Sequence, residues 1–321
     1  MRPRSTVLLG ALLSLALGLV TTVISGQLTG RFENRADTVT MERSHLHSGG
    51  YSIGGGHHWP KRSQNRVLFP LALEGLVALG WPPVRSYSEL RLLTAWLAFA
   101  TIYGVARRLA PDDPSTAAGA AIVAALATIA SFNFPYEIAS DFPDLAFTAV
   151  GVLVVYERRI WAALLVSCLM SANRESSLFI GLMWVGLGGR AQLWRGLGLI
   201  TTAWLVVSVL RYITAGTDGL VGPTLPLRDT FEATADFMRA PRMAGWPVLG
   251  ASMAGVLLGW LVPRWPRMSA AGRRLVWTAG VVVLITAVMA RLDELRVLLP
   301  AVAMLALAGA LEQNAPRAAH E

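Results

Sequence analysis

Carboxylates in the polar stretches between apolar runs are the residues best suited to chemistry. Asp37 lies 11 residues after Gly26, where the first apolar run ends, and Asp141 and Asp144 come at the start of a later run. A carboxylate held in such a place can act as a general base or a metal ligand. Asp141 and Asp144 are three residues apart, so they share a face if a helix has begun. The alternative is that they cap this helix and interact with its dipole.

Arginines that interrupt or border apolar runs form the second group. Arg174 and Glu175 stand inside one run, and Arg291 and Arg296 stand before the last. Charged residues within membrane segments mark functional sites by default, although local ion pairing is the alternative. Arg66 opens a short apolar run, where a guanidinium can hold a phosphate through two hydrogen bonds or extend to the water interface. We therefore expect Arg66, Arg174, Arg291 and Arg296, with Glu175 beside them as a partly neutralising acid, to form a site for an anionic group such as a lipid-linked phosphate.

Four of the five histidines lie in the first polar stretch, at positions 45, 47, 57 and 58. Histidines at this spacing can bind a transition metal, and His57 and His58 are the candidate ligands. A flexible loop rich in glycine, or rings lying at the headgroup level, is the alternative. The single cysteine, Cys168, excludes a disulfide framework and a cysteine-based metal site.

Composition identifies the elements that must position these residues. The 321 residues are 54% hydrophobic and only 15% charged, with a mean hydropathy of +0.50. A soluble chain carries about 25% charged residues. The apolar residues also fall in blocks of roughly 15–20, the length of a membrane-spanning helix. Disorder and a soluble enzyme are therefore excluded, and the prediction is an all-α, polytopic transmembrane bundle.

The apolar blocks predict about ten spans in a single transmembrane domain over residues 1–321. They cover residues 6–26, 90–108, 115–132, 144–156, two segments within 160–189, 196–212, 246–263, 275–290 and 295–311. The run 160–189 is expected to break at Asn173–Ser177, either as two short spans or as a re-entrant hairpin. Residues 27–89 form the first extracytoplasmic loop and 214–245 the second. Within the first, residues 67–80 reach only about 20 Å as a helix, so we expect an interfacial helix.

The net charge of +8 rests on 28 basic residues, 27 of them arginine. Taken alone, this excess is compatible with nucleic acid or anionic lipid as a partner. Assigned to the predicted spans, 13 basic and 5 acidic residues lie on the side of the N-terminus, against 15 of each on the other side. The excess therefore indicates topology, with both termini cytoplasmic, and no nucleic-acid partner. The expected location is the bacterial inner membrane.

The order of several short motifs carries a family resemblance. R-V-L-x-P at Arg66–Pro70 leads the short helix, and G-x-P-P at Gly80–Pro83 precedes S-E-L-R-L at Ser88–Leu92. The following span ends in A-R-R-L, and E-L-R-x-x-L-P occurs late, at Glu294–Pro300. With the outer acids and the polar break, this order resembles the GT-C membrane glycosyltransferases, in particular bacterial mannosyltransferases and aminoarabinose transferases.

The resemblance implies transfer of a sugar from a polyprenyl-phosphate-linked donor to a glycan, lipid or protein acceptor on the extracytoplasmic side. It implies a catalytic acid at Asp37, with Glu33 and Glu42 as rivals, and a second at Asp141 or Asp144. Arg66, Arg174, Arg291 and Arg296 would hold the donor phosphate, with Mg²⁺ or Mn²⁺ as a possible cofactor. Two other classes are the alternatives: a transporter or lipid flippase, and a non-catalytic accessory subunit of similar architecture.

Overall fold

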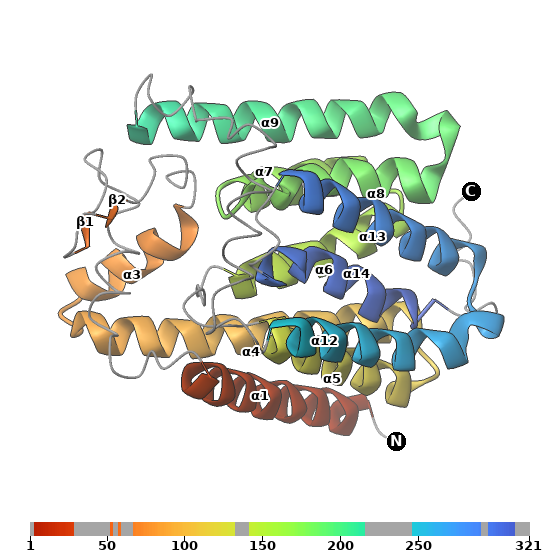
Figure 1. The fold of residues 1–321 in the computed structure, drawn as a ribbon, viewed down its shortest axis with the longest axis horizontal. Coiled ribbons are helices and arrows are strands. Elements are labelled where there is room, and N and C mark those ends of the chain that lie inside the picture. The colour runs from red at the N-terminus through yellow and green to blue at the C-terminus, as the bar shows by residue number, and fades with distance from the viewer. Residues whose placement is uncertain are drawn as a thin grey trace.

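The computed structural model describes residues 3–28, 52–53, 57–58, 67–131, 141–215, 246–289 and 295–311, and this part of the chain is helical apart from one pair of two-residue strands (Figure 1). The α-helices are α1 (Pro3–Leu28), α3 (Leu68–Ala78), α4 (Pro83–Leu109), α5 (Pro114–Ser131), α6 (Asp141–Tyr156), α7 (Ile160–Ser171), α8 (Leu178–Gly188), α9 (Leu193–Ala215), α12 (Trp246–Leu261), α13 (Ala270–Met289) and α14 (Leu299–Ala308). The 3-10 helices are η2 (Glu175–Ser177), η3 (Arg190–Gln192), η5 (Val262–Arg267) and η6 (Leu295–Leu298). Strands β1 (Ser52–Ile53) and β2 (His57–His58) pair antiparallel.

All the α-helices except α3 run along the long axis of the molecule, and successive ones alternate in direction (Figure 1). The central helices α6 and α14 are surrounded by others: α14 packs against α5, α6, α12 and α13. Nearly every residue of α14 is buried, as expected for a helix that is apolar all round. The predicted all-α bundle is confirmed.

The outer surface of the bundle is apolar. Trp161, Trp194 and Trp277 are 80%, 82% and 72% exposed, and large aliphatic side chains on the same three helices are exposed as well. Within the described residues, the helices α1, α4, α5, α9 with η3, and α12 with η5 are each long and apolar enough to cross a membrane. Apolar side chains on the outside and on the inside are consistent with an integral membrane protein.

Small residues bring the helices into close contact. The buried face of α5 is made largely of alanines, and Trp260 of α12 lies against Gly119 of α5 and Gly309 after α14. The Trp260 indole N–H donates to the Ala306 carbonyl at 3.0 Å, which satisfies its polar atom in the apolar interior. Helices without a hydrophobic driving force between them associate through such small-residue contacts.

Helix α3 packs across the first turns of α4, away from the central helices. Phe69 and Leu73 of α3 contact Tyr87 and Leu90 of α4, and the Phe69 and Tyr87 rings meet edge to face at 5.7 Å. The predicted helix over 67–80 is therefore present. Helix α4 begins about two turns before the predicted span, because Pro83 in the first turn starts a helix at no hydrogen-bonding cost.

One end of the bundle, called the basic end below, carries most of the described arginines. Glu157 contacts Arg108 at 3.2 Å and Arg159 at 2.8 Å, joining the end of α4 to the α6–α7 turn. The Leu187 carbonyl at the end of α8 accepts hydrogen bonds from Arg158 and Arg274. Burial, together with the charge of Arg274, lowers the pKa of Arg158.

Asp113 caps the start of α5 at the basic end. Its carboxylate accepts hydrogen bonds from the Ser115 and Thr116 backbone N–H groups at 2.9 and 3.1 Å and from both hydroxyls. These bonds, the Ser115 hydroxyl first, lower the Asp113 pKa to about 2. An aspartate in this position satisfies N–H groups that a helix start leaves unpaired.

The contact between α8 and α9 gives a matched test of packing. A Cβ on Gly196 would meet Val185 Cγ2 at 2.3 Å and the Gly181 carbonyl oxygen at 2.9 Å, whereas one on Gly198, on the same helix, would meet nothing within 4 Å. Gly198→Ala should therefore stabilise by up to about 1 kcal/mol through helix propensity. Gly196→Ala should destabilise by about 1–3 kcal/mol through overpacking. Unfolding in mixed detergent micelles measures both, and equal effects at the two positions would contradict this packing.

Candidate functional site

The run 160–189 is broken where its polar residues lie. Helix α7 ends at Ser171, the chain becomes extended at Arg174, and α8 begins at Leu178. The two helices are 12 and 11 residues long and run antiparallel (Figure 1). The expected break at Asn173–Ser177 is confirmed, and a single long helix through these charges does not form.

An ion pair between Asp141 and Arg174 occupies this break. The Arg174 guanidinium donates from one terminal nitrogen to the Asp141 carboxylate, which lies in the first turn of α6. Both side chains are buried, at 0% and 8% exposure for Asp141 and Arg174. A buried charge without a partner costs several kcal/mol, so each of the two side chains requires the other.

A second contact joins the same two elements. The Ser176 hydroxyl donates to the Asp144 carboxylate, one turn further along α6. Asp144 is fully buried, and the buried hydroxyls of Thr148 and Ser177 have no hydrogen-bond partner among the described residues. The break is thus held to α6 by two side-chain contacts, and the interior beside it is polar.

A third pair lies nearer the surface. Arg211 of α9 donates to Glu175 at 2.6 Å, with side chains 24% and 37% exposed. The predicted residues Arg174 and Glu175 therefore lie in one cluster with Asp141 and Asp144. The partner of Glu175, Arg211 of α9, was not predicted. Its signal was present, since Arg211 is a single charge at the end of a long apolar run, where membrane helices seldom carry one.

The start of α3 also meets the break. The backbone N–H groups of Val67 and Leu68 donate to the Ala172 carbonyl at 2.8 and 3.2 Å. Arg66 is the residue immediately before Val67 in the sequence. Val67, the residue after Arg66, is therefore hydrogen-bonded to Ala172, which lies two positions before Arg174 in the sequence.

We call the cluster of Asp141, Asp144, Arg174, Glu175, Ser176 and Arg211 the break cluster.

The remaining candidates are described in part or not at all. Asp37, Arg66 and Arg291 lie outside the described residues, as do Glu33 and Glu42. Arg296 belongs to η6, whose backbone packs beside α5, α13 and α14. His57 and His58 form β2, paired with Ser52 and Ile53.

The acids of the break cluster do more than cap α6. Each accepts a hydrogen bond from a side chain more than thirty positions away in the sequence, so they join α6 to the α7–α8 break. They do not suit Mg²⁺ or Mn²⁺, because Arg174 already neutralises Asp141 and the described residues contain no group of three metal-binding side chains. No step below is routed through a metal ion.

Arg174 keeps donors that Asp141 does not use. A guanidinium carries five N–H donors, and one terminal nitrogen of Arg174 contacts Asp141. Among the described residues, no other partner of this guanidinium is found, and 8% of the side chain is exposed. The planar fork of an arginine held in this way suits an oxygen anion, since it binds phosphate through two parallel hydrogen bonds.

The pair Asp141–Arg174 predicts a strong thermodynamic coupling. Asp141→Leu or Arg174→Met alone leaves a buried charge unpaired and should cost about 3–5 kcal/mol of unfolding free energy. The double variant should cost much less than the sum, because neither charge remains. The exposed pair Arg85–Glu89, 3.8 Å apart, is the control and should couple by about 0–1 kcal/mol. Additive costs at Asp141 and Arg174, measured in mixed detergent micelles, would contradict the pairing.

Comparison with protein-family models, with curated protein sequences and with solved structures finds no match to this chain. The resemblance carried by the short motifs therefore remains a hypothesis. The function has to be argued from the break cluster, the apolar exterior of the bundle and the distribution of charge over its two ends.

Proposed function

We propose that the chain is a polytopic inner-membrane protein built on ten apolar helices, α1, α4, α5, α6, α7, α8, α9, α12, α13 and α14. Of these, α7, α8 and α14 are only 12, 11 and 10 residues long, so each enters the hydrocarbon core without spanning its full thickness. The basic end is cytoplasmic in this proposal, together with both termini. Two lists of described residues support this orientation. The basic end carries eleven arginines (4, 107, 108, 158, 159, 190, 195, 264, 267, 273 and 274) and three acids (112, 113 and 157). The other end carries five arginines (85, 91, 174, 211 and 296) and five acids (74, 89, 141, 144 and 175). Cytoplasmic loops are enriched in basic residues, which favours the first end.

The function that this arrangement supports best is transfer of a sugar from a polyprenyl-phosphate-linked donor to an acceptor hydroxyl on the extracytoplasmic side. The observation that supports this function most directly is the buried Arg174. It is held by Asp141, it keeps N–H donors that Asp141 does not use, and it lies at the end of the bundle opposite the basic end. Charged groups at such a depth in a membrane bundle are expensive and mark functional sites. A lipid-linked phosphate can reach them from the bilayer.

The reaction can be written for the chain's own residues. A carboxylate takes the proton of the acceptor hydroxyl, whose oxygen then bonds to the anomeric carbon as the bond from that carbon to the phosphate oxygen breaks. The polyprenyl phosphate leaves with the electron pair. Arg174, with Arg211 beside it, stabilises this negative charge in a site of low dielectric constant. Asp141 positions Arg174, and Asp144 positions Ser176.

The proton acceptor in this proposal is Asp37, with Glu33 and Glu42 as its rivals. Asp141 and Asp144 are fully buried and already accept hydrogen bonds from Arg174 and Ser176. A base must lie within hydrogen-bond distance of the proton that it removes. These three acids precede α3 in the sequence, and the start of α3 is hydrogen-bonded to the break.

The orientation can be tested with single cysteines in a Cys168→Ser background. Trp81 lies in the turn between α3 and α4, and Asp112 lies in the turn between α4 and α5, where both are exposed. A membrane-impermeant maleimide should label Trp81→Cys in intact spheroplasts and Asp112→Cys only after permeabilisation. The reverse pattern would place the break cluster on the cytoplasmic side and contradict the proposal.

The activity can be tested with membranes supplied with a radiolabelled polyprenyl-phosphate sugar. Arg174→Gln should lower transfer by about 100-fold or more, since it removes the cation that faces the leaving group. Arg174→Lys should recover part of the rate. The control is Arg85→Gln, on α4 and largely exposed, which should retain the rate.

Asp37→Asn completes this experiment. It should abolish transfer while donor binding persists, because it removes the base and leaves the phosphate site intact. Unchanged turnover would remove Asp37 from the mechanism and direct the test to Glu33 and Glu42. Donor binding without any transfer by the native chain would instead favour a flippase or an accessory subunit.

A further inference from the structure

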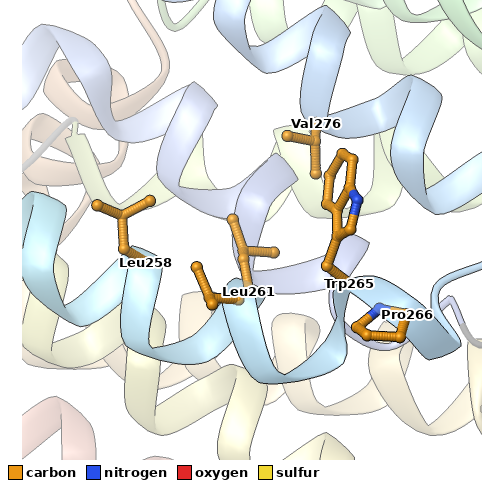
Figure 2. Close-up of a pocket in the computed structure, with 6 residues that line it drawn as sticks. Leu258, Leu261, Trp265, Pro266 and Val276 are labelled. Atoms are coloured by element: carbon orange, nitrogen blue, oxygen red, sulfur yellow. The ribbon is translucent and has the colours of Figure 1, made fainter.

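A groove at the basic end is open to the outside of the bundle between α12 and α13. It has a volume of about 360 Å³ and is lined by Leu258, Leu261, Val262, Trp265, Pro266 and Val276. Figure 2 shows the labelled side chains on α12, on η5 and on α13. Leu258 and Val262 are 58% and 63% exposed, so the groove faces outward and is not part of the core. This volume is within the range of small-molecule sites, about 300–1,000 Å³.

The elements around the groove are basic and contain no acid. Residues 246–289 include arginines at positions 264, 267, 273 and 274 but neither aspartate nor glutamate. Arg264 stacks on the Trp260 ring at 3.5 Å, and Arg274 donates to the Leu187 carbonyl. Arg273 also donates, from Nη2 to the Trp265 carbonyl at 3.4 Å. These three arginines therefore contact the protein, but no carboxylate within residues 246–289 neutralises any of the four charges.

Arg267 and Arg273 lie next to the lining residues. Arg267 follows Pro266 directly and is exposed, and no contact to it is found among the described residues. The Arg273 guanidinium carbon lies 5.7 Å from the centroid of the Trp265 ring. Its Nε is buried and has no hydrogen-bond partner in the described part of the chain. The other terminal nitrogen of Arg273, Nη1, makes no hydrogen bond in the described part of the chain and can donate to an anion.

We propose that this groove binds an anionic diacyl phospholipid, with an acyl chain along the apolar lining and the phosphate at Arg267 and Arg273. A basic pocket between transmembrane helices on the cytoplasmic side is suited to such headgroups. Trp265 has the amphipathic ring that favours the membrane interface, between the acyl region and the headgroups. The proposal depends on the chain lying in a membrane and is independent of sugar transfer.

The test is native mass spectrometry of the purified full chain in detergent, titrated with phosphatidylglycerol and with phosphatidylcholine of the same acyl chains. The native chain should bind the anionic lipid more tightly. Arg267→Gln with Arg273→Gln should lower the affinity for phosphatidylglycerol by about tenfold, because two headgroup charges are lost. The affinity for phosphatidylcholine should change little.

Two further variants separate the site from its surroundings. Arg190→Gln with Arg195→Gln removes two charges from the same end but outside the groove, and should leave phosphatidylglycerol binding unchanged. Leu258→Trp fills the groove and keeps all the arginines, and should weaken binding of both lipids. Equal losses in the two double-arginine variants would overturn the proposal, since only the overall charge would then matter. Unchanged binding by Leu258→Trp, or full displacement of the lipid by inorganic phosphate, would overturn it as well.

Discussion

The need of Arg174 for a buried partner determines how the middle of this chain folds. A guanidinium in an apolar bundle has to be paired, and the pair has to be held in place, because an unpaired charge there costs several kcal/mol. Asp141 meets this requirement from the first turn of α6. For the two side chains to meet, α7 has to end at Ser171 and α8 has to turn back at Leu178. The ion pair therefore fixes both the break and the level at which α6 begins.

The same constraint divides the bundle into two chemically different ends. At the basic end, Arg158 and Arg274 donate to the carbonyl at the end of α8, and Arg159 pairs with Glu157. Other arginines at this end are exposed. At the other end, acids and arginines alternate in contacts between α6, the break and α9. Helix α3 is bonded to the break rather than to the basic end. This difference between the two ends is consistent with the proposed orientation of the chain.

Much of this fold could be predicted from the sequence because the membrane imposes a simple pattern. Long apolar runs become helices, so the bounds of α5, α6 and α12 fall within a few residues of the predicted spans. The break at Asn173–Ser177 was predictable because a continuous helix would bury Arg174 unpaired. The start of α4 was not predicted, since the residues between Pro83 and Leu90 are mostly polar; in the structure Tyr87 and Leu90 pack against Phe69 and Leu73 of α3.

The candidate site was harder to predict. Polarity inside apolar runs pointed to Asp141, Asp144, Arg174 and Glu175, but which residues pair is decided by tertiary packing. Ser176 and Asp144 are 32 positions apart, so no local sequence pattern predicts their contact. Arg211 was missed because it ends an otherwise ordinary span. The close approach of α8 and α9 at Gly196 was equally invisible, since the sequence does not distinguish it from Gly198.

The most direct measurement is a structure of the protein in lipid nanodiscs with a polyprenyl-phosphate sugar bound. The account predicts that the donor phosphate lies within hydrogen-bond distance of the Arg174 guanidinium, about 3 Å, while Asp141 stays paired on the other side. The sugar should face the first extracytoplasmic loop. A phosphate bound away from the break cluster, or a cluster closed to the donor on every side, would contradict it.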